Sequence, residues 1–259
     1  MQRALWSAVT GMHAQERSLD VVANNLANVN TAGFKSSRIR FQDMLYATLV
    51  IPGASGADGE VGGVQVGHGV RVAGASRSFT QGALTETGNA LDLAIEGDGF
   101  FEVTLPDGQS AYTRDGSFSM NGAGEVITSD GYRVVGFDTI DPGTTDITIT
   151  RDGSFTAVVN GTSVQKGRLS LSRFLNPEGL NSIGRNLYKE TEASGAAEGG
   201  LQPGVNGVGG LAQRYLEHSN VSTATELVNM ITTQRAYEAT SKAIRTSDEM
   251  MSTANQIVR

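Results

Sequence analysis

Both ends of this chain carry apolar side chains at every seventh position. Near the N-terminus the repeating set is Leu5, Met12, Leu19 and Leu26, with a companion set at Ala8, Gln15, Val22 and Val29. Near the C-terminus the sets are Met230, Tyr237, Ile244, Met251 and Val258, then Thr233, Thr240, Ser247 and Ala254. Apolar residues at the first and fourth places of a seven-residue repeat are typical of helices that wind around other helices. The pattern therefore predicts one helix over residues 3–30 and another from about residue 221 to 259.

The sequence also indicates where these helices begin and end. The stretch Asn24–Asn30 is poor in strong helix formers, so we expect the first helix to fray there. Gly33 is the expected stop, because glycine readily adopts the left-handed conformation that ends many helices. Thr223 followed by Glu226 is a capping-box pattern, which predicts that the second helix begins near Val221.

The long middle of the chain predicts β-hairpins. Its turns are marked by the dipeptides Asp107-Gly108, Asp115-Gly116, Asn121-Gly122, Asp130-Gly131, Asp152-Gly153 and Asn160-Gly161. Such dipeptides suit type I′ hairpin turns, in which both central residues have positive φ. Between them, runs such as 147–150 and 169–172 alternate apolar and polar side chains, as half-buried strands do. The region is therefore expected to be a β-rich domain.

One hexapeptide, Thr-Arg-Asp-Gly-Ser-Phe, occurs twice in this region, at 113–118 and at 150–155. Two explanations remain open. The same turn chemistry has arisen twice, which we favour, or a hairpin has been duplicated.

These patterns predict an α+β fold in which the N- and C-terminal helices pair as a coiled coil and flank a β-rich, hairpin-built central domain. The expected segments are an N-terminal coiled-coil helix at 1–33, a connector at 34–70, the β-rich domain at 71–190, a return linker at 191–215 and a C-terminal coiled-coil helix at 216–259. The first part of the connector, with Ile39, Phe41, Met44 and Leu45, is expected to form a short helix or a strand pair. The connector is then expected to be flexible between Pro52 and Gly63, and to contain a strand over 64–72, where valines alternate.

Composition narrows the classes of function. The 259 residues include 33 glycines and only 39% hydrophobic residues, which fits several small β modules better than one large core. The net charge of −7 falls mostly between the helices, so nucleic acid binding is not expected, since phosphate contacts need clustered Lys and Arg. The absence of cysteine excludes disulfides and thiolate metal sites. The sequence has neither a run of apolar residues long enough to span a membrane nor a cleavable signal at Met1–Trp6.

Candidate chemistry is sparse. His13, His68 and His218 are scattered and have no partners at metal-ligand spacing, so no metal or catalytic histidine is expected. Residues 207–212 match a G-x-G-x-x-A pattern, but a linker rather than a buried strand precedes them, so we interpret the match as a false positive. Residues 95–101 are interpreted as a tight turn before a strand rather than as a calcium loop. We therefore expect neither catalytic residues nor a cofactor, and we do not expect this chain to be an enzyme.

The terminal helices instead suggest self-assembly. Pairing within one chain is a sufficient explanation of the repeat, but it would leave outer apolar residues such as Trp6 and Val228 in water, where each loses about 1.5–3 kcal/mol of burial. We therefore favour packing between molecules. The predicted assembly interface consists of Leu5, Met12, Leu19, Val22, Leu26, Val29, Leu227, Met230, Ile231, Tyr237, Ile244, Met251 and Val258.

Four stretches carry a resemblance to a known family. Asn24–Lys35 resembles the N-terminal signature of the bacterial flagellar rod and hook proteins. Leu93–Phe101 and Tyr112–Phe118 resemble the central module of these proteins, and Glu226–Glu238 resembles their C-terminal helix. The motifs occur in the family's order and together span essentially the whole chain.

The resemblance implies a structural subunit of the flagellar distal rod, since the length and the segment 64–70 resemble that kind of member. Another rod- or hook-type axial protein of the family is the alternative. The family implies a homo-oligomeric, helical, hollow tube that transmits torque and serves as an export channel. It also implies a basal-body location from the periplasm to the outer membrane, type III export without a cleaved signal, and contacts with proximal rod proteins, the hook protein and the surrounding rings. No nucleic acid and no membrane insertion is expected.

Two rivals belong to other classes. A cell-wall hydrolase fused to a rod-like body would need a pair of carboxylates in a cleft, and none stands out in the sequence. An adhesin with a trimeric helical stalk would form trimers instead of filaments.

Overall fold

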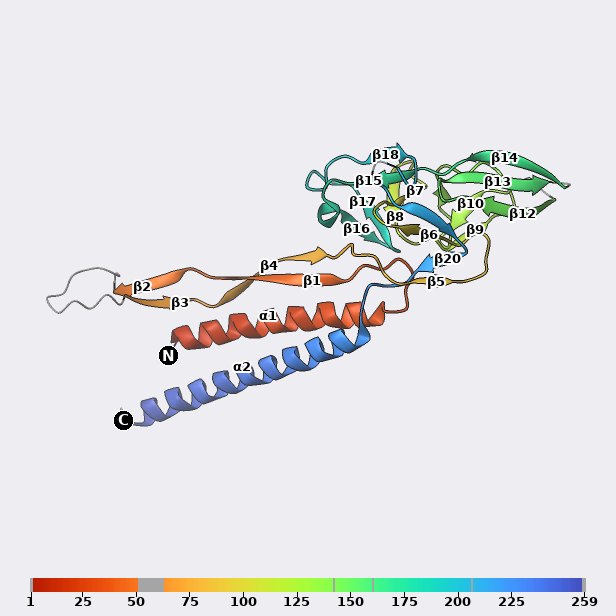
Figure 1. The fold of residues 1–259 in the computed structure, drawn as a ribbon. Helices are drawn as coiled ribbons and strands as arrows, with labels where there is room; N and C mark the ends of the chain where they lie inside the picture. Colours follow the sequence, from red (N-terminus) through yellow and green to blue (C-terminus); the bar gives the residue numbers. More distant parts are fainter. Residues whose placement is uncertain (1, 51–62, 142, 160, 206, 258–259) are drawn as a thin grey trace. The chain divides into compact units, whose positions relative to one another are not determined.

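A computed structural model of the chain describes residues 2–50, 63–141, 143–159, 161–205 and 207–257 (Figure 1). The predicted flexible segment from Pro52 to Gly63 lies outside the described residues, except for Gly63 itself. Internal contacts divide the chain into two compact units. Unit 1 comprises Met1–Leu26, Ser37–Ser76 and Ser222–Arg259, and unit 2 comprises Ala27–Ser36 and Arg77–Val221. Within the described residues, no helix is long and apolar enough to cross a membrane.

Unit 1 contains the two predicted helices, α1 (Gln2–Ala27) and α2 (Thr223–Ile257). α1 ends short of the predicted limit at residue 30, as its weak helix formers suggest. The cap of α2 lies one residue before the predicted capping box, because Ser222 Oγ accepts a hydrogen bond from Thr225 N at 3.5 Å. The α+β class with a helix at each end is confirmed.

The rest of unit 1 consists of two-stranded β-ribbons, where we predicted mainly a connector. The paired strands are β1 (Ser37–Asp43) with β4 (Val70–Arg77), and β2 (Tyr46–Val50) with β3 (Val64–Gly67). The strand predicted at 64–72 is interrupted between β3 and β4 by Gly69, whose φ is 106°. Thr10 on α1 contacts the chain directly after this interruption, because its Oγ1 accepts a hydrogen bond from Val70 N at 3.3 Å.

Unit 2 contains antiparallel sheets, as its turn-rich sequence predicts. Its largest sheet has seven strands in the order β16 (Asn181–Gly184), β17 (Leu187–Lys189), β8 (Ser110–Thr113), β7 (Phe101–Thr104), β11 (Arg133–Val134), β10 (Val126–Thr128) and β9 (Phe118–Met120). A second sheet joins β12 (Thr144–Ile149), β13 (Ser154–Val159) and β14 (Thr162–Arg168). The paired strands are β15 (Leu171–Arg173) with β18 (Glu198–Leu201), β6 (Leu93–Glu96) with β19 (Gly210–Gln213), and β5 (Leu84–Glu86) with β20 (Tyr215–Glu217). A short 3₁₀ helix, η1, spans Pro177–Gly179.

The hydrophobic cores of the described residues lie in unit 2. The larger cluster contains Phe101, Phe118 and Phe155, contributed by β7, β9 and β13, so it joins the seven-stranded and three-stranded sheets. A smaller aromatic cluster surrounds Tyr188, with edge-to-face contacts among its rings. Unit 2 therefore has the buried apolar interior that an independently stable domain needs.

The expected turn type is wrong. In the turns at Gly108, Gly131 and Gly153 only the glycine has positive φ, at 78°, 85° and 82°. Each glycine N also donates to the carbonyl three residues earlier, at 2.9 Å, so the chain makes a type I turn followed by a left-handed glycine. Two consecutive positive φ values, as in a type I′ turn, occur instead at Arg185 and Asn186, between β16 and β17.

The repeated hexapeptide adopts two different backbone arrangements. In the second copy Gly153 turns the hairpin between β12 and β13, whereas in the first copy Gly116 lacks positive φ and lies against Leu93 O. Both copies nevertheless use the same local bonding, because Asp115 and Asp152 each accept hydrogen bonds from the serine two residues later. This favours recurring turn chemistry over a duplicated hairpin.

The segment predicted as a return linker contributes two strands to unit 2. β18 pairs with β15, and β19 pairs with β6 through the partners Gly210–Glu96 to Gln213–Leu93. The G-x-G-x-x-A match at 207–212 thus runs into a strand rather than into a helix, so it lacks the turn-to-helix context of a dinucleotide-binding loop.

Candidate assembly surface and the junction of the terminal segments

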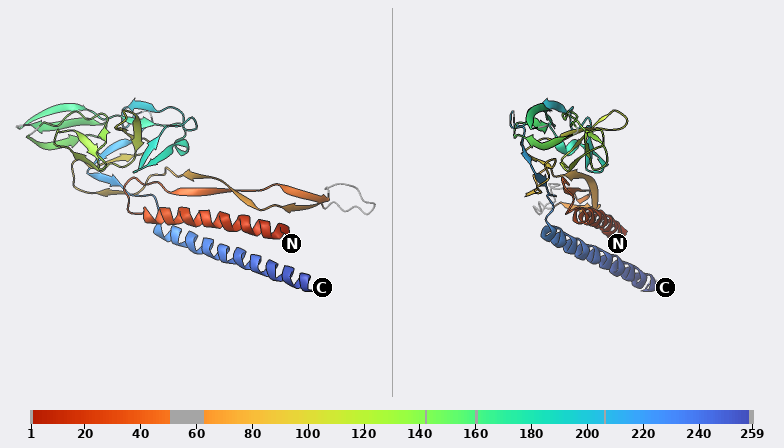
Figure 2. Two further views of the ribbon diagram at one scale, coloured as in Figure 1. Left: turned by 180° about the vertical axis from the view of Figure 1, so that it is seen from behind. Right: turned by 90° about the vertical axis from the view of Figure 1, so that its right-hand side faces the viewer.

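α1 and α2 run side by side and antiparallel within unit 1 (Figures 1 and 2). Near one end of the pair, Asn25 Nδ2 donates to Glu226 Oε1 at 3.4 Å. Two heptads further along each helix, a Cβ added to Gly11 would lie 3.6 Å from Thr240 Cγ2. Midway between these contacts on α2, Thr233 is buried, with 8% of its surface exposed. The two helices therefore keep one register, and the predicted coiled-coil pairing is confirmed.

The seam between the helices is formed by small or polar side chains. Its contacts fall on Gly11 and Asn25 in α1, and on Glu226 and Thr240 in α2. Successive helix residues are about 100° apart, so the large apolar residues of each repeat flank this seam. Small side chains allow close approach of the two helices, and the large residues are left beside the seam rather than in it.

The predicted interface residues differ in exposure within the single chain. Val22 is buried and Leu227, Ile231 and Tyr237 are exposed. The half-buried members are Leu5, Met12, Leu19, Leu26, Val29, Met230, Ile244 and Met251. Val258 lies outside the described residues. Apart from Val22, the described members thus keep apolar surface that is accessible to another molecule.

Unit 1 exposes further apolar residues that sequence reasoning missed. On its ribbons Leu45 is 88% exposed, and Phe41, Tyr46 and Leu49 are also exposed. Trp6 on α1, which the sequence had indicated as an outer apolar residue, is exposed as well. No hydrophobic core cluster forms among the described residues of unit 1. Alternation of Ile39 and Phe41 with polar residues was the available signal for such a ribbon.

A buried charge cluster joins the ends of unit 2. Lys35 and Glu217 are both fully buried, and Lys35 Nζ donates to Glu217 Oε1 at 2.6 Å and to Thr80 O at 2.7 Å. Arg114 is buried beside them, with Nη1 3.6 Å from Glu217 Oε2 and its guanidinium over the Phe100 ring. The cluster links the segment that enters unit 2, the segment that leaves it and the β-rich middle of the chain.

Asn220 ties the same segments together through its side chain. Its Oδ1 accepts from Ser36 N at 2.7 Å, and its Nδ2 donates to Ser78 O at 2.8 Å. Gly33 N also donates to Glu217 O at 2.8 Å. We call Lys35, Glu217 and Asn220, with the backbone segments they bind, the junction.

Burial dominates the electrostatics of the junction. It lowers the pKa of Lys35 below its ordinary value, and the adjacent Glu217 carboxylate opposes that shift. Burial also lowers the pKa of Arg114, whose Nε and Nη1 have no hydrogen-bond partner. Next to Arg114, burial raises the pKa of the Asp115 carboxyl. Glu217 lies beside both buried cations, with Oε1 2.6 Å from Lys35 Nζ and Oε2 3.6 Å from Arg114 Nη1.

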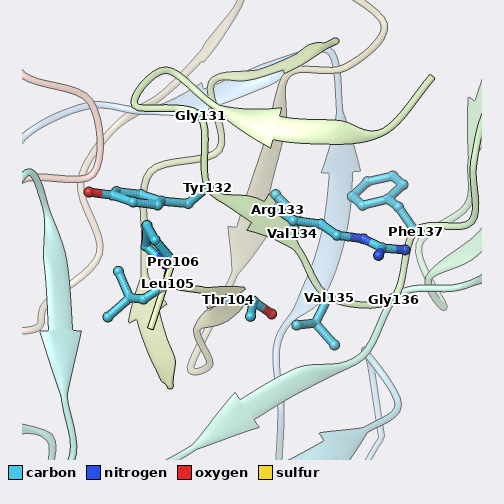
Figure 3. A pocket seen from close by; sticks show the side chains of 10 residues that line it. All are labelled: Thr104, Leu105, Pro106, Gly131, Tyr132, Arg133, Val134, Val135, Gly136 and Phe137. Atoms are coloured by element: carbon cyan, nitrogen blue, oxygen red, sulfur yellow. The ribbon is translucent and has the colours of Figure 1, made fainter. Parts of the chain in front are cut away.

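Other chemistry is limited in the part of the chain that the structure describes. No group of three or more His, Asp or Glu side chains there is arranged to hold a metal ion. His13 lies on the surface beside Glu16. A groove of about 590 Å³ in unit 2 is lined by Thr104–Pro106 and Gly131–Phe137, with Tyr132 close to the first of these segments (Figure 3). Its lining residues include no carboxylate, so this groove lacks the acid pair of a glycoside hydrolase.

Three stretches of the chain match known families. Residues 5–35 match the flagella basal body rod protein family, residues 94–157 the flagellar hook protein FlgE/F/G D1 domain, and residues 212–257 the flagellar basal body rod FlgEFG protein C-terminal region. The chain is 46% identical to the flagellar basal-body rod protein FlgG of Borreliella burgdorferi over 100% of both chains. The chain belongs to the flagellar basal-body rod proteins. The family resemblance found in the sequence is confirmed.

Two relatives from one organism separate the types of rod protein. This rod protein is 45% identical to FlgG of Caulobacter vibrioides, covering 98% of this chain and 99% of the relative. It is 35% identical to FlgF of the same bacterium, covering 98% and 97%. The similarity therefore favours the FlgG type over that other rod-type protein.

Each charged residue of the buried cluster lies in a different matched stretch of this rod protein. Lys35 is the last residue of the first, Arg114 falls within the second and Glu217 within the third. Lys35 and Arg114 occur in the motifs that carried the sequence resemblance, but their pairing with Glu217 spans most of the chain. No local sequence pattern predicts the contact between Lys35 and Glu217, which are 182 positions apart.

Proposed function

We propose that this chain is a structural subunit of the flagellar distal rod, and that it polymerises helically into a hollow, torque-transmitting tube that also serves as an export channel. Its similarity to FlgG proteins over the full length supports the choice of rod segment. An open helical polymer needs two complementary, non-identical surfaces on each subunit, and extended helices and ribbons provide them.

One observation carries the proposal. Both core clusters of the described residues lie in unit 2, whereas unit 1 exposes Trp6, Leu45, Leu227 and Ile231. Burial of apolar surface contributes roughly 25 cal/mol per Å², so these side chains gain stability only when something covers them. Sister copies packed along the helices and ribbons would supply that cover. The thirteen residues of the predicted assembly interface are part of this proposal.

The location and partners follow from the proposed role. The polymer would extend from the periplasm to the outer membrane, joined to proximal rod proteins at one end and to the hook protein at the other, inside the basal-body rings. The subunit would be exported through the flagellar type III apparatus without a cleaved signal. It would have no catalytic activity, and a cell-wall digestion assay with the purified chain tests this point.

A pair of substitutions on α2 tests the role in assembly. Ile231→Asp puts a charge on an exposed apolar position, and Asn229→Asp puts the same charge about 200° around the helix. Each variant replaces the native chain in cells, and isolated basal bodies are examined by electron microscopy. We expect Ile231→Asp to lack distal rods and Asn229→Asp to retain them. Normal rods in both variants would contradict the assignment of this surface.

A further inference from the structure

The seam between α1 and α2 does not by itself specify one register. Its positions repeat every seven residues, and on α2 they are small: Thr233, Thr240 and Ser247. Large interlocking side chains would penalise a slip of one heptad, but small ones provide few distinguishing contacts. The hydrogen bond from Asn25 Nδ2 to Glu226 Oε1 crosses the seam and depends on the register, but at 3.4 Å it provides only a modest preference. Something else must select the observed pairing.

The junction restrains both helices through short pieces of chain. On the α2 side only Val221 and Ser222 separate Asn220 from the start of the helix. A slip of one heptad moves a helix by about 10 Å along its axis, which is about the full reach of those two residues. Val221 is buried and its N donates to Ser219 Oγ at 3.3 Å, so this piece is not free to extend.

α1 is restrained at its C-terminal end and through the segment that follows it. Asn186 Nδ2 donates to Ala32 O at 3.0 Å, and Gly33 N donates to Glu217 O. Within unit 1, Asn25 exchanges two hydrogen bonds of 2.9 Å with the backbone of Ser37. The end of α1 is therefore fixed independently of its contact with α2.

We propose that Lys35, Glu217 and Asn220 are positioning residues that set the register of the α1–α2 pair. They hold the segments that lead into and out of unit 2 beside each other, so the helices begin to pair from one defined end. This register decides which residues of α1 and α2 lie opposite each other across the seam. The proposal concerns the single chain and does not rest on the proposed polymer.

The chain has no cysteine, so introduced pairs report the register directly. Gly11→Cys with Thr240→Cys reports the observed pairing. Gly11→Cys with Thr233→Cys, and Gly11→Cys with Ser247→Cys, report slips of one heptad in the two directions. The purified full-length chain is oxidised under dilute conditions, and intramolecular disulfides are identified by mass spectrometry. Oxidation traps transient pairs, so the assay works even where the helices open and close.

We expect the first cysteine pair to form a disulfide at least about tenfold faster than either slipped pair. Asn220→Ala should reduce this preference to about twofold or less, equivalent to a few tenths of a kcal/mol. Asn176→Ala is the matched control, because it removes an asparagine hydrogen bond of 3.0 Å to Ala193 O in unit 2 and leaves the junction intact. This control should keep the full preference.

A second variant keeps the test decisive if Asn220→Ala unfolds unit 2. Six Gly and Ser residues inserted after Val221 leave every junction residue in place and only lengthen the tether to α2. The insertion should abolish the preference while thermal unfolding of unit 2 stays unchanged. An undiminished preference in the insertion variant would overturn the proposal, and so would one in a folded Asn220→Ala protein.

Discussion

Glu217→Gln tests the buried charge cluster most directly. In the native chain the side chains of Lys35, Glu217 and Arg114 are at most 2% exposed. Glutamine has nearly the same shape, and it keeps an oxygen that can accept from Lys35 and from Gly82 N, which lies 2.9 Å from Glu217 Oε1. The substitution therefore removes charge while changing the packing little.

The expected loss of stability is large because two buried cations lose their shared counter-ion. Removing one partner of a buried ion pair costs about 3–5 kcal/mol, since the remaining charge is left uncompensated in a poorly solvated site. For a domain of this size, each kcal/mol lowers the melting temperature by about 2–4 °C, so unit 2 should melt roughly 6–20 °C lower at pH 7. Urea and thermal unfolding, followed by circular dichroism, measure both quantities.

The loss should shrink as the pH rises. Burial lowers the folded-state pKa of Lys35 below the ordinary value of 10.5, and Glu217 is the main group that holds it up. In the variant that support is gone, so the folded state releases the Lys35 proton more readily than the unfolded state does. Stability increases with pH wherever the unfolded state binds more protons. The stability deficit of Glu217→Gln should therefore be smaller at pH 9 than at pH 7.

Arg114→Met is the control within the same cluster. It leaves the Lys35–Glu217 pair with no net charge and removes a guanidinium in which two nitrogens make no hydrogen bond. The free energy of unfolding of unit 2 should therefore change by no more than about 1 kcal/mol. A loss below about 1 kcal/mol for Glu217→Gln at pH 7, with no change at pH 9, would refute the electrostatic reasoning.

The sequence predicted the elements whose signal is local. A seven-residue repeat defines α1 and α2 because helix periodicity is a property of neighbouring residues. Alternation and turn dipeptides predicted a β-rich middle for the same reason. The turn type was wrong because an Asx-Gly pair also fits a type I turn with a left-handed glycine, and the flanking strands decide between the two.

Contacts between distant segments were out of reach. From the local sequence alone, Lys35 is a charged residue shortly after Gly33 and would be predicted to be exposed, as charged residues usually are. Its burial depends on Glu217, which enters unit 2 only when β20 pairs with β5. The ribbon made by β1 and β4 was missed for a similar reason, because its two strands are separated by the segment that suggested a flexible connector.

The seam shows which part of the repeat closes the helix pair within one chain. The large apolar residues of each repeat were predicted to form an interface between molecules, and the contacts within the chain fall on Gly11, Asn25 and Thr240. Small residues close the pair within one chain and leave Met12 and Ile244 half-buried beside it. A repeat of this kind fits a chain whose helices pair first with each other and then with further helices.

Three further substitutions test separate parts of the molecule. Asp115→Asn should stabilise unit 2 at pH 7 but not at pH 3. Burial raises the folded-state pKa of Asp115 above the ordinary value of 3.8, so the native chain loses stability as the pH rises from 3.8 through the folded-state pKa. Equal effects of the substitution at both pH values in urea unfolding would contradict this. Gly33→Ala places a Cβ 2.5 Å from Asp115 N at a φ of 66°, so it should lower the stability of unit 2 by about 1–3 kcal/mol. The control, Gly108→Ala, has a similar φ of 78° but open space around the new Cβ, so it should cost only about 1 kcal/mol. Thermal unfolding compares the two variants, and equal losses would show that the contact with Asp115 N does not matter. Ile244→Asp puts a charge on the half-buried flank of the seam, so cells should lose distal rods and motility while unit 2 keeps its melting temperature. Intact rods and normal swimming with Ile244→Asp would mean that this flank is not covered by sister copies.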